Sequence, residues 1–334
     1  STLESLQRRH RQLPLLLYLG AVVLLAGLFA GGLLAMAQAG GVSGWVLAPL
    51  GALALLGTSH QAVALANWLG TLLVRPFALP RMDFSVGIPP EARTLVVTPT
   101  MLTSVSGIEA LVDALEVRFL ANRDDSLHFG LLTDLRDADE ETLPEDEGLV
   151  QLAAHRVEAL NDKYRRVRGD TFFLFHRGRR WNVQERVWMG YERKRGKLAD
   201  LNALLRGDAE DRFSRVVGDT AILWNVKYVI TLDTDTQLPR DAARELVGAM
   251  THPLNRPRYD ADQQRVCEGY GILQPRVAVS LPGANRSRYA RLYGSDAGID
   301  PYTRAVSDLY QDWFQEGSFI GKGIYDVDAF EQAL

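Results

Sequence analysis

The chain has 334 residues, of which 47% are hydrophobic, and a formal net charge of -4. This near-neutral balance excludes nucleic acid as the main partner, because proteins that bind nucleic acid carry a basic surplus. A single cysteine, Cys267, excludes an intrachain disulfide and any metal site built from several cysteines, and it suits a reducing cytoplasm. Charged residues are scarce before residue 80 and frequent after it. We therefore expect a membrane segment over residues 1–84 and a soluble domain over residues 85–334.

Two long apolar runs fill the first part of the chain. Residues 13–37 contain no charge and are long enough to cross a bilayer as a helix. Residues 45–74 form a second run, which follows a glycine-rich turn. Arginines flank the outer ends of both runs and are absent from the short connection, so the positive-inside rule places both ends in the cytoplasm. The sequence thus predicts a multi-pass membrane protein with a cytoplasmic soluble domain.

The second apolar run contains polar residues, among them His60 and Asn67. Polar groups at membrane depth are usually buried against protein or functional. The alternative is a span that ends near residue 56 and gives way to an interfacial helix anchored by Trp68. The residue types leave both alternatives open and assign no role to His60.

Strands and helices alternate in the soluble part. Apolar runs bounded by polar residues predict strands over residues 93–102, 127–135, 171–177, 228–232 and 269–279. Helical spacing of apolar residues predicts helices over residues 108–120, 148–168 and 241–250, and a further helix that opens at Leu198. An acidic run, residues 137–147, is expected to form a solvated loop or a helix cap. This order predicts an α/β fold with a mostly parallel sheet.

Two carboxylates, Asp233 and Asp235, follow the strand over residues 228–232. Because side chains alternate along a strand, both can face one site only if the chain leaves the pleat at Thr234, which places the pair on a turn. Ligands of open α/β sheets bind beyond the carboxyl ends of the strands. A divalent ion held by such a pair can neutralise a nucleoside diphosphate. A solvated acidic turn is the alternative.

Two further segments carry candidate binding residues. In the first, Lys197 and neighbouring basic residues precede a helix, whose N-terminus adds donors for an anion. We expect either pyrophosphate binding by Lys197 or a neighbour, or an exposed basic loop. In the second, Gly317, Gly321 and Gly323 either let the backbone approach a ligand closely or form a structural bend.

The chain resembles a GT-A glycosyltransferase in five features that follow one another in order: a strand with Thr100, a strand ending in Asp134, the GKLADLN segment, the Asp233 and Asp235 pair, and the SFIGKG segment. Five longer blocks resemble the glycosyltransferase domain of cyclic β-1,2-glucan synthases: TLDTDTQLPRDAAREL, THPLNRP, YGILQPRV, GIDPYTRAVSDLYQD and EGSFIGKGIYDVDAF. The match covers nearly everything from residue 190 to the end of the chain. It implies a Rossmann-like GT-A domain preceded by a transmembrane helical hairpin.

This resemblance implies an enzyme that transfers glucose from UDP-glucose to a growing β-1,2-glucan, which is later cyclised. The reaction would be inverting, would depend on Mg2+ or Mn2+, and would take place on the cytoplasmic side of the bacterial inner membrane. UDP-glucose, the glucan acceptor and the lipid bilayer are the expected partners. Two alternatives stay open: a synthase of a linear β-glucan or another hexose polymer, and a membrane-anchored nucleotide-sugar-binding module without activity.

The resemblance also assigns roles to individual residues. Asp233 and Asp235 would be catalytic residues that bind the donor diphosphate and its metal, with Asp235 the firmer ligand. Asp134 would contact the nucleoside, Thr100 would line the base pocket, and Lys197 would lie near the phosphates. The glycine-rich segment would lie on the acceptor side.

Two departures from the family pattern bear on these roles. Met101, Leu102 and Thr103 stand where many related synthases place an acidic residue after the first strand. Related synthases also carry an acceptor-side acidic motif and a Gln-x-x-Arg-Trp motif after the glycine-rich segment, whereas this chain ends at Leu334. We therefore expect an N-terminal fragment that lacks the general base and is completed by downstream domains of the same polypeptide.

Overall fold

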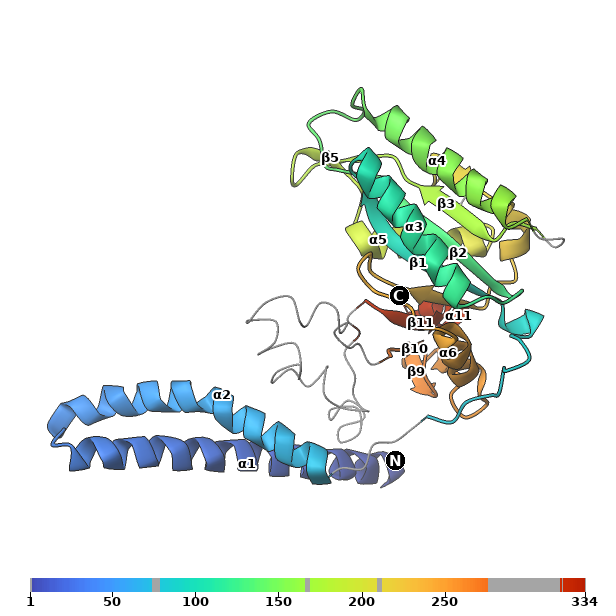
Figure 1. The fold of residues 1–334 in the computed structure, drawn as a ribbon. Helices are drawn as coiled ribbons and strands as arrows, with labels where there is room; N and C mark the ends of the chain where they lie inside the picture. Colours follow the sequence, from blue (N-terminus) through green and yellow to red (C-terminus); the bar gives the residue numbers. More distant parts are fainter. Residues whose placement is uncertain are drawn as a thin grey trace. The chain divides into compact units, whose positions relative to one another are not determined.

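The computed structural model describes residues 2–73, 79–165, 169–208, 212–275, 319 and 321–333 (Figure 1). These residues fall into two compact units. The first unit contains the described residues before residue 79 and is helical. The second unit contains the described residues from residue 79 onward and is of the α/β type.

The helical unit is a hairpin of two apolar helices. They are α1 (Thr2–Ala39) and α2 (Leu47–Leu73), joined through a short 3-10 helix, η1 (Gly44–Val46). Gly41 and Gly44 have φ angles of +90° and +74°, which glycine adopts without strain. By length and composition, the segments Leu15–Ala39 and Gly44–Gly70 could each cross a membrane. The helix α2 runs unbroken past residue 56, as the fully spanning alternative requires.

Small residues line the contact between α1 and α2. Ala30 and Ala62 are buried, and small side chains let apolar helices approach closely. The hydroxyl of Tyr18 donates a hydrogen bond of 2.8 Å to Oδ1 of Asn67, so this amide is buried against protein. His60 lies on the exposed surface of α2.

The α/β unit is built on a seven-stranded sheet with the order β10-β11-β7-β1-β2-β3-β6. Its strands are β1 (Thr94–Leu102), β2 (Leu127–Leu135), β3 (Phe172–His176), β6 (Arg215–Val217), β7 (Tyr228–Thr231), β10 (Ile272–Leu273) and β11 (Gly323–Asp326). The neighbours β7, β1, β2 and β3 are parallel, and β6, β11 and β10 join the sheet through antiparallel pairs. The mostly parallel sheet expected from the sequence is confirmed.

The register of the parallel strands brings their carboxyl ends to one edge of the sheet. Thr133 of β2 lies opposite Thr100 of β1 on one side and opposite His176, the last residue of β3, on the other. Val97 of β1 lies opposite Thr231, the last residue of β7. Residues that follow these four strands therefore share one edge, which is where ligands of open α/β sheets bind.

Helices cover both faces of the sheet. They are α3 (Val105–Ala121), α4 (Asp146–Lys163), α5 (Arg193–Leu205), α6 (Ala242–Thr251) and α11 (Val327–Ala333). On one face, α3, α4 and α6 pack in a core that includes Phe172 and Leu174 of β3. On the other face, α5 and α11 pack in a core that includes Phe173 and Phe175. Alternate side chains of one strand thus fill two cores, as in a sheet buried on both faces.

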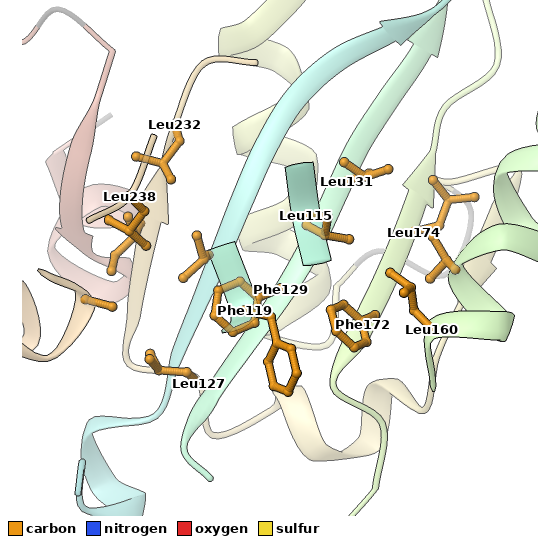
Figure 2. Close-up of a cluster of buried hydrophobic side chains, with 14 of the residues drawn as sticks. Leu115, Phe119, Leu127, Phe129, Leu131, Leu160, Phe172, Leu174, Leu232 and Leu238 are labelled. Atoms are coloured by element: carbon orange, nitrogen blue, oxygen red, sulfur yellow. The ribbon is translucent and has the colours of Figure 1, made fainter. Parts of the chain in front are cut away.

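Aromatic rings fill the core under α3 and α4, as Figure 2 shows. Phe119 of α3 meets Phe129 of β2 and Phe172 of β3 edge to face, at ring-centroid distances of 5.8 and 5.0 Å. Such pairs stabilise a core beyond the apolar area that they bury. These contacts hold the C-terminal half of α3 against the amino-terminal parts of β2 and β3.

Smaller elements flank the central layers. They are the hairpin of β4 (Arg180–Asn182) and β5 (Val187–Met189), the hairpin of β8 (Arg258–Asp260) and β9 (Arg265–Glu268), and two 3-10 helices, η2 (Pro90–Ala92) and η3 (Thr220–Leu223). The sequence predicted none of them, because segments of three or four residues are too short to show a hydrophobic period.

Several helix boundaries differ from the predicted ones, since α3 begins at Val105 and not at residue 108, and α4 ends at Lys163 and not at residue 168. The helix expected to open at Leu198 begins at Arg193, so that prediction was wrong by more than a turn. The basic residues that were expected to form a loop make up the first turn of α5. The chain enters this turn through left-handed φ angles of 49° at Glu192 and 50° at Arg193. The helix expected from residue 148 begins at Asp146, where the acidic run supplies its first turn.

The predicted strand over residues 269–279 is observed only as β10, and residues 276–279 lie outside the described part of the chain. The glycine-rich segment leads into β11, which was not expected as a strand. Its four residues pair with β7, and two of them, Ile324 and Tyr325, also pair with β10, so this segment adds a strand to the sheet.

We expect Phe172→Ala to lower the free energy of unfolding of the α/β unit by about 3–5 kcal/mol, because it leaves a cavity beside Phe119 and Phe129. Urea denaturation of the detergent-solubilised protein, followed by near-UV circular dichroism, measures this loss. Val183→Ala is the control, because Val183 is exposed and its truncation should change the free energy of unfolding by less than about 0.5 kcal/mol. Equal stabilities for the two variants would contradict the assigned core.

Candidate active site

The turn after β7 presents the two carboxylates to the outside. The chain leaves the strand after Thr231, and the backbone N–H of Thr236 donates to the carbonyl of Asp233 at 3.1 Å, which closes the turn. The side chain of Asp233 is partly buried, whereas Asp235 is exposed. The pair lies on a turn beyond the strand, as the alternation of side chains had predicted.

A buried arginine holds this turn from beneath. Arg118 of α3 donates to the carbonyl oxygens of Asp233, Thr234 and Thr236 at 3.3, 3.0 and 2.9 Å, and to Oγ1 of Thr98 at 3.3 Å. Burial lowers the pKa of Arg118, and the nearby Asp235 carboxylate acts against that shift. Because the carbonyls point inward to the guanidinium, the carboxylates are left to point outward.

Two lysines contact the first carboxylate. Nζ of Lys194, in the first turn of α5, lies 2.6 Å from Oδ1 of Asp233, and Nζ of Lys322 lies 3.3 Å from Oδ2. Partial burial raises the pKa of Asp233, but the two lysines outweigh it and hold that pKa below its ordinary value. Lys194 also donates to the carbonyl of Gly321 at 2.5 Å. One amine thus joins α5, the carboxylate turn and the glycine-rich segment.

A second, buried group of charges lies at the ends of β1 and β2. Asp134 is 2% exposed and accepts from Nζ of Lys197 at 2.8 Å and from Arg177 at 3.2 Å. Lys197 also donates to the carbonyl of Thr100 at 2.6 Å. Burial lowers the pKa of Lys197, and the neighbouring Asp134 carboxylate partly offsets the shift. The structure therefore brings Thr100, Asp134 and Lys197 together, with the amine bonded to both strands.

The buried group continues along α5. Arg177 donates to Asp200 at 2.7 Å, and Arg212 donates to the other oxygen of Asp200 at 2.9 Å. Gly190 lies directly against Asp134, because a Cβ at this position would be 2.0 Å from Oδ2 of Asp134. No larger residue fits there without displacing the carboxylate from its cations.

Local structure explains why glycine stands at two positions of the predicted acceptor-side segment. Gly321 has a φ angle of +86°, and its carbonyl accepts from Lys194. A Cβ on Gly323 would lie 2.4 Å from the carbonyl of Leu273, the neighbouring residue of β10. These contacts give Gly321 and Gly323 structural reasons of their own, and Gly317 lies outside the described residues.

The sequence had not singled out Arg118, Arg177 or Lys322 as members of the site, and it had included Lys194 only as a basic neighbour of Lys197. Lys194 and Lys197 are three residues apart, so they share one face of α5 and meet the two groups of carboxylates side by side. Recognising α5 from Arg193 onward would have suggested this pairing. Arg118 and Arg177 carried no local signal, because only the tertiary fold brings them to the carboxylates.

The residues of the turn fit a divalent ion that arrives with a phosphate group. Within the described residues, no three side chains of the His, Cys, Asp or Glu type are grouped as a cation cage. Mg2+ is commonly held by one or two carboxylates together with substrate phosphates, which is what Asp233 and Asp235 can offer. The ion pairs named above contain five cationic groups and three carboxylates, and this surplus favours an anionic ligand.

The sheet, the carboxylate turn at its carboxyl edge and the two apolar helices are together consistent with a membrane-linked domain of the GT-A-like type. No protein-family model matches the chain. Over 280 residues, which are 84% of its length, the chain is 45% identical to cyclic beta-(1,2)-glucan synthase NdvB of Rhizobium meliloti. The chain spans 10% of the length of that protein. The resemblance found in the sequence is thereby confirmed.

We expect Gly190→Ala to lower the free energy of unfolding by about 2 kcal/mol, because the new methyl group displaces Asp134 from Lys197 and Arg177 and leaves buried charges poorly paired. Urea denaturation measures the loss. Gly178→Ala is the matched control, since a Cβ there meets no atom within 4 Å. The cost of Gly190→Ala should shrink when Asp134 is first replaced by Ala, and full additivity of the two changes would contradict the contact.

The buried imidazole of His176 makes stability depend on pH. It is 2% exposed, its Nδ1 lies 2.9 Å from Oγ1 of Thr133, and burial lowers its pKa to about 4, against the attraction of Asp134 and Asp146. Between the unfolded pKa of about 6.5 and the folded value, only the unfolded state binds the proton. Stability should therefore fall by about 3 kcal/mol as the pH falls through this window.

The measurement is the free energy of unfolding at a series of pH values between 7 and 4. His176→Gln should flatten the part of the profile that lies between about pH 6.5 and pH 4. His155→Gln, on the exposed surface of α4, is the control and should leave the profile unchanged. A profile that keeps its full slope in His176→Gln would show that another group is responsible.

Proposed function

We propose that this chain is the donor-binding part of a glycosyltransferase that transfers glucose from UDP-glucose to a growing β-1,2-glucan, which is later cyclised. The observation that carries the proposal is the pair Asp233 and Asp235 on a turn at the carboxyl edge of a mostly parallel sheet, flanked by Lys194 and Lys322. Further support comes from the name of the R. meliloti relative, a cyclic beta-(1,2)-glucan synthase.

Asp235 and Asp233 would hold Mg2+ or Mn2+ together with phosphate oxygens of the donor. When bound, such an ion stabilises the negative charge that develops on a departing diphosphate. Arg118 fixes the carboxylate turn, so the two carboxylates need not reorganise when the donor binds. The buried pair of Lys197 and Asp134 fixes the ends of β1 and β2 in the same way, beside the place proposed for the nucleoside.

Transfer of an α-linked glucose to form a β linkage requires attack by an acceptor hydroxyl opposite the leaving UDP. A carboxylate must then take the proton of that hydroxyl. In our proposal the carboxylates of the turn act on the diphosphate, and a downstream domain of the same polypeptide supplies the general base. The small share of the relative that this chain spans supports this division of labour.

The two apolar helices would anchor the enzyme in the inner membrane, with the α/β unit on the cytoplasmic side. Arginines beyond the outer ends of both apolar runs support this orientation. It would place the donor site in the compartment that contains nucleotide sugars and let the glucan grow next to the bilayer.

Asp235→Ala should weaken the metal-dependent binding of UDP-glucose to the full-length protein by at least about 100-fold, since even outer-shell changes at metal sites cost about 10–100-fold. Isothermal titration of UDP-glucose in detergent, with Mn2+ and with EDTA, measures this effect. Asp139→Ala, in the exposed acidic loop, removes the same charge away from the turn and is the control.

Unchanged, metal-dependent affinity in Asp235→Ala would refute the assigned role. Binding without any transfer or donor hydrolysis by the full-length protein would favour a nucleotide-sugar-binding module. A product with another linkage would favour a synthase of a different hexose polymer.

A further inference from the structure

Both carboxylate oxygens of Asp233 are occupied by lysines of the chain itself. Oδ1 is 2.6 Å from Nζ of Lys194, and Oδ2 is 3.3 Å from Nζ of Lys322. Asp235 differs, because it is exposed and is contacted by the hydroxyl of Thr236 at 3.5 Å. The two carboxylates of this turn therefore differ: Asp233 is neutralised by ammonium groups, whereas Asp235 is exposed to solvent.

The two lysines come from different elements that meet at this carboxylate. Lys194 belongs to the first turn of α5, and Lys322 belongs to the glycine-rich segment before β11. Lys194 also donates to the carbonyl of Gly321, the residue next to Lys322. The backbone enters α5 through left-handed conformations at Glu192 and Arg193, which only a well-fixed surrounding maintains. The amines are thus held in place, although each lysine side chain keeps some exposure to solvent.

This arrangement opposes a divalent ion that arrives alone. Such an ion would have to displace two ammonium groups from Asp233 and would then lie close to both of them, with charges of the same sign. A diphosphate changes the balance, because its oxygens accept from ammonium groups as carboxylates do. The lysines would then have new partners within reach, and Asp233 would be released for the ion.

We propose that Lys194 and Lys322 neutralise Asp233 in the unliganded protein and move to the donor diphosphate when the metal and the nucleotide bind together. The inference rests on the proposed function and adds two donor-binding residues to it. As a consequence, the affinity for the metal depends on the nucleotide: the metal binds weakly without the nucleotide and strongly with it. The lysines thereby couple the two ligands, since each ligand provides what the other one needs.

The test measures Mn2+ binding to the full-length protein by electron paramagnetic resonance, with and without UDP, and UDP binding by calorimetry in the presence of Mn2+. In Lys194→Met, the affinity for Mn2+ alone should rise about tenfold, since a competing ammonium group is gone, while the affinity for UDP should fall about tenfold. Lys322→Met should likewise raise the affinity for Mn2+ alone and lower the affinity for UDP. Arg195→Met removes a positive charge from an exposed neighbour and should leave both affinities unchanged.

The opposite signs of the two changes separate this proposal from a structural role. If Lys194 only stabilised the fold, its loss would weaken both Mn2+ and UDP binding, and that result would overturn the proposal. Unchanged affinities in both lysine variants would overturn it as well. If the unaltered protein showed no metal-dependent UDP binding, the proposed function would fail together with this inference, whereas normal binding in the unaltered protein leaves only the lysines in question.

Discussion

Mutual neutralisation of charge at one edge of the sheet is the constraint on which the site depends. Four parallel strands end at this edge, where Asp134 lies at the end of β2 and Asp233 follows β7. A carboxylate this buried is stable only when it is paired and hydrogen-bonded, as Asp134 is with Lys197 and Arg177. The parallel arrangement therefore requires a row of basic residues opposite the strand ends. The face of α5 that carries Lys194 and Lys197 supplies part of that row.

The charges of this edge fall into a rigid part and an exchangeable part. The pairs of Asp134 with Lys197 and Arg177, and that of Asp200 with Arg177, are buried, so removing one partner would leave an unpaired charge at a high cost in free energy. The pairs around Asp233 keep partial contact with solvent, where an ion pair contributes little and is easily replaced. Burial thus separates the groups that shape the edge from those that are free to meet a ligand.

The main features of the fold could be predicted from the sequence, because long apolar strands and amphipathic helices carry clear periods. The position of Asp233 and Asp235 on a turn also followed from local pattern alone. The residues that contact this turn could not be predicted from local pattern. Arg118 lies on a helix more than a hundred residues earlier in the chain, where an arginine resembles any surface cation. The contact of Lys194 with Asp233 could not be predicted, because no local pattern shows that α5 begins before Gly196, through two left-handed residues that are not glycine.

The late strand β11 has a consequence for the synthesis of the protein. It lies between β7 and β10, so β7 remains an unpaired edge strand until residues 323–326 have been made. Exposed edges of this kind pair readily with other chains, and a nascent protein that emerges from the ribosome must avoid such pairing. Lys322 arrives with the same segment and contacts Asp233. Closure of this edge of the sheet and the contact of Lys322 with the carboxylate turn therefore depend on the same short segment.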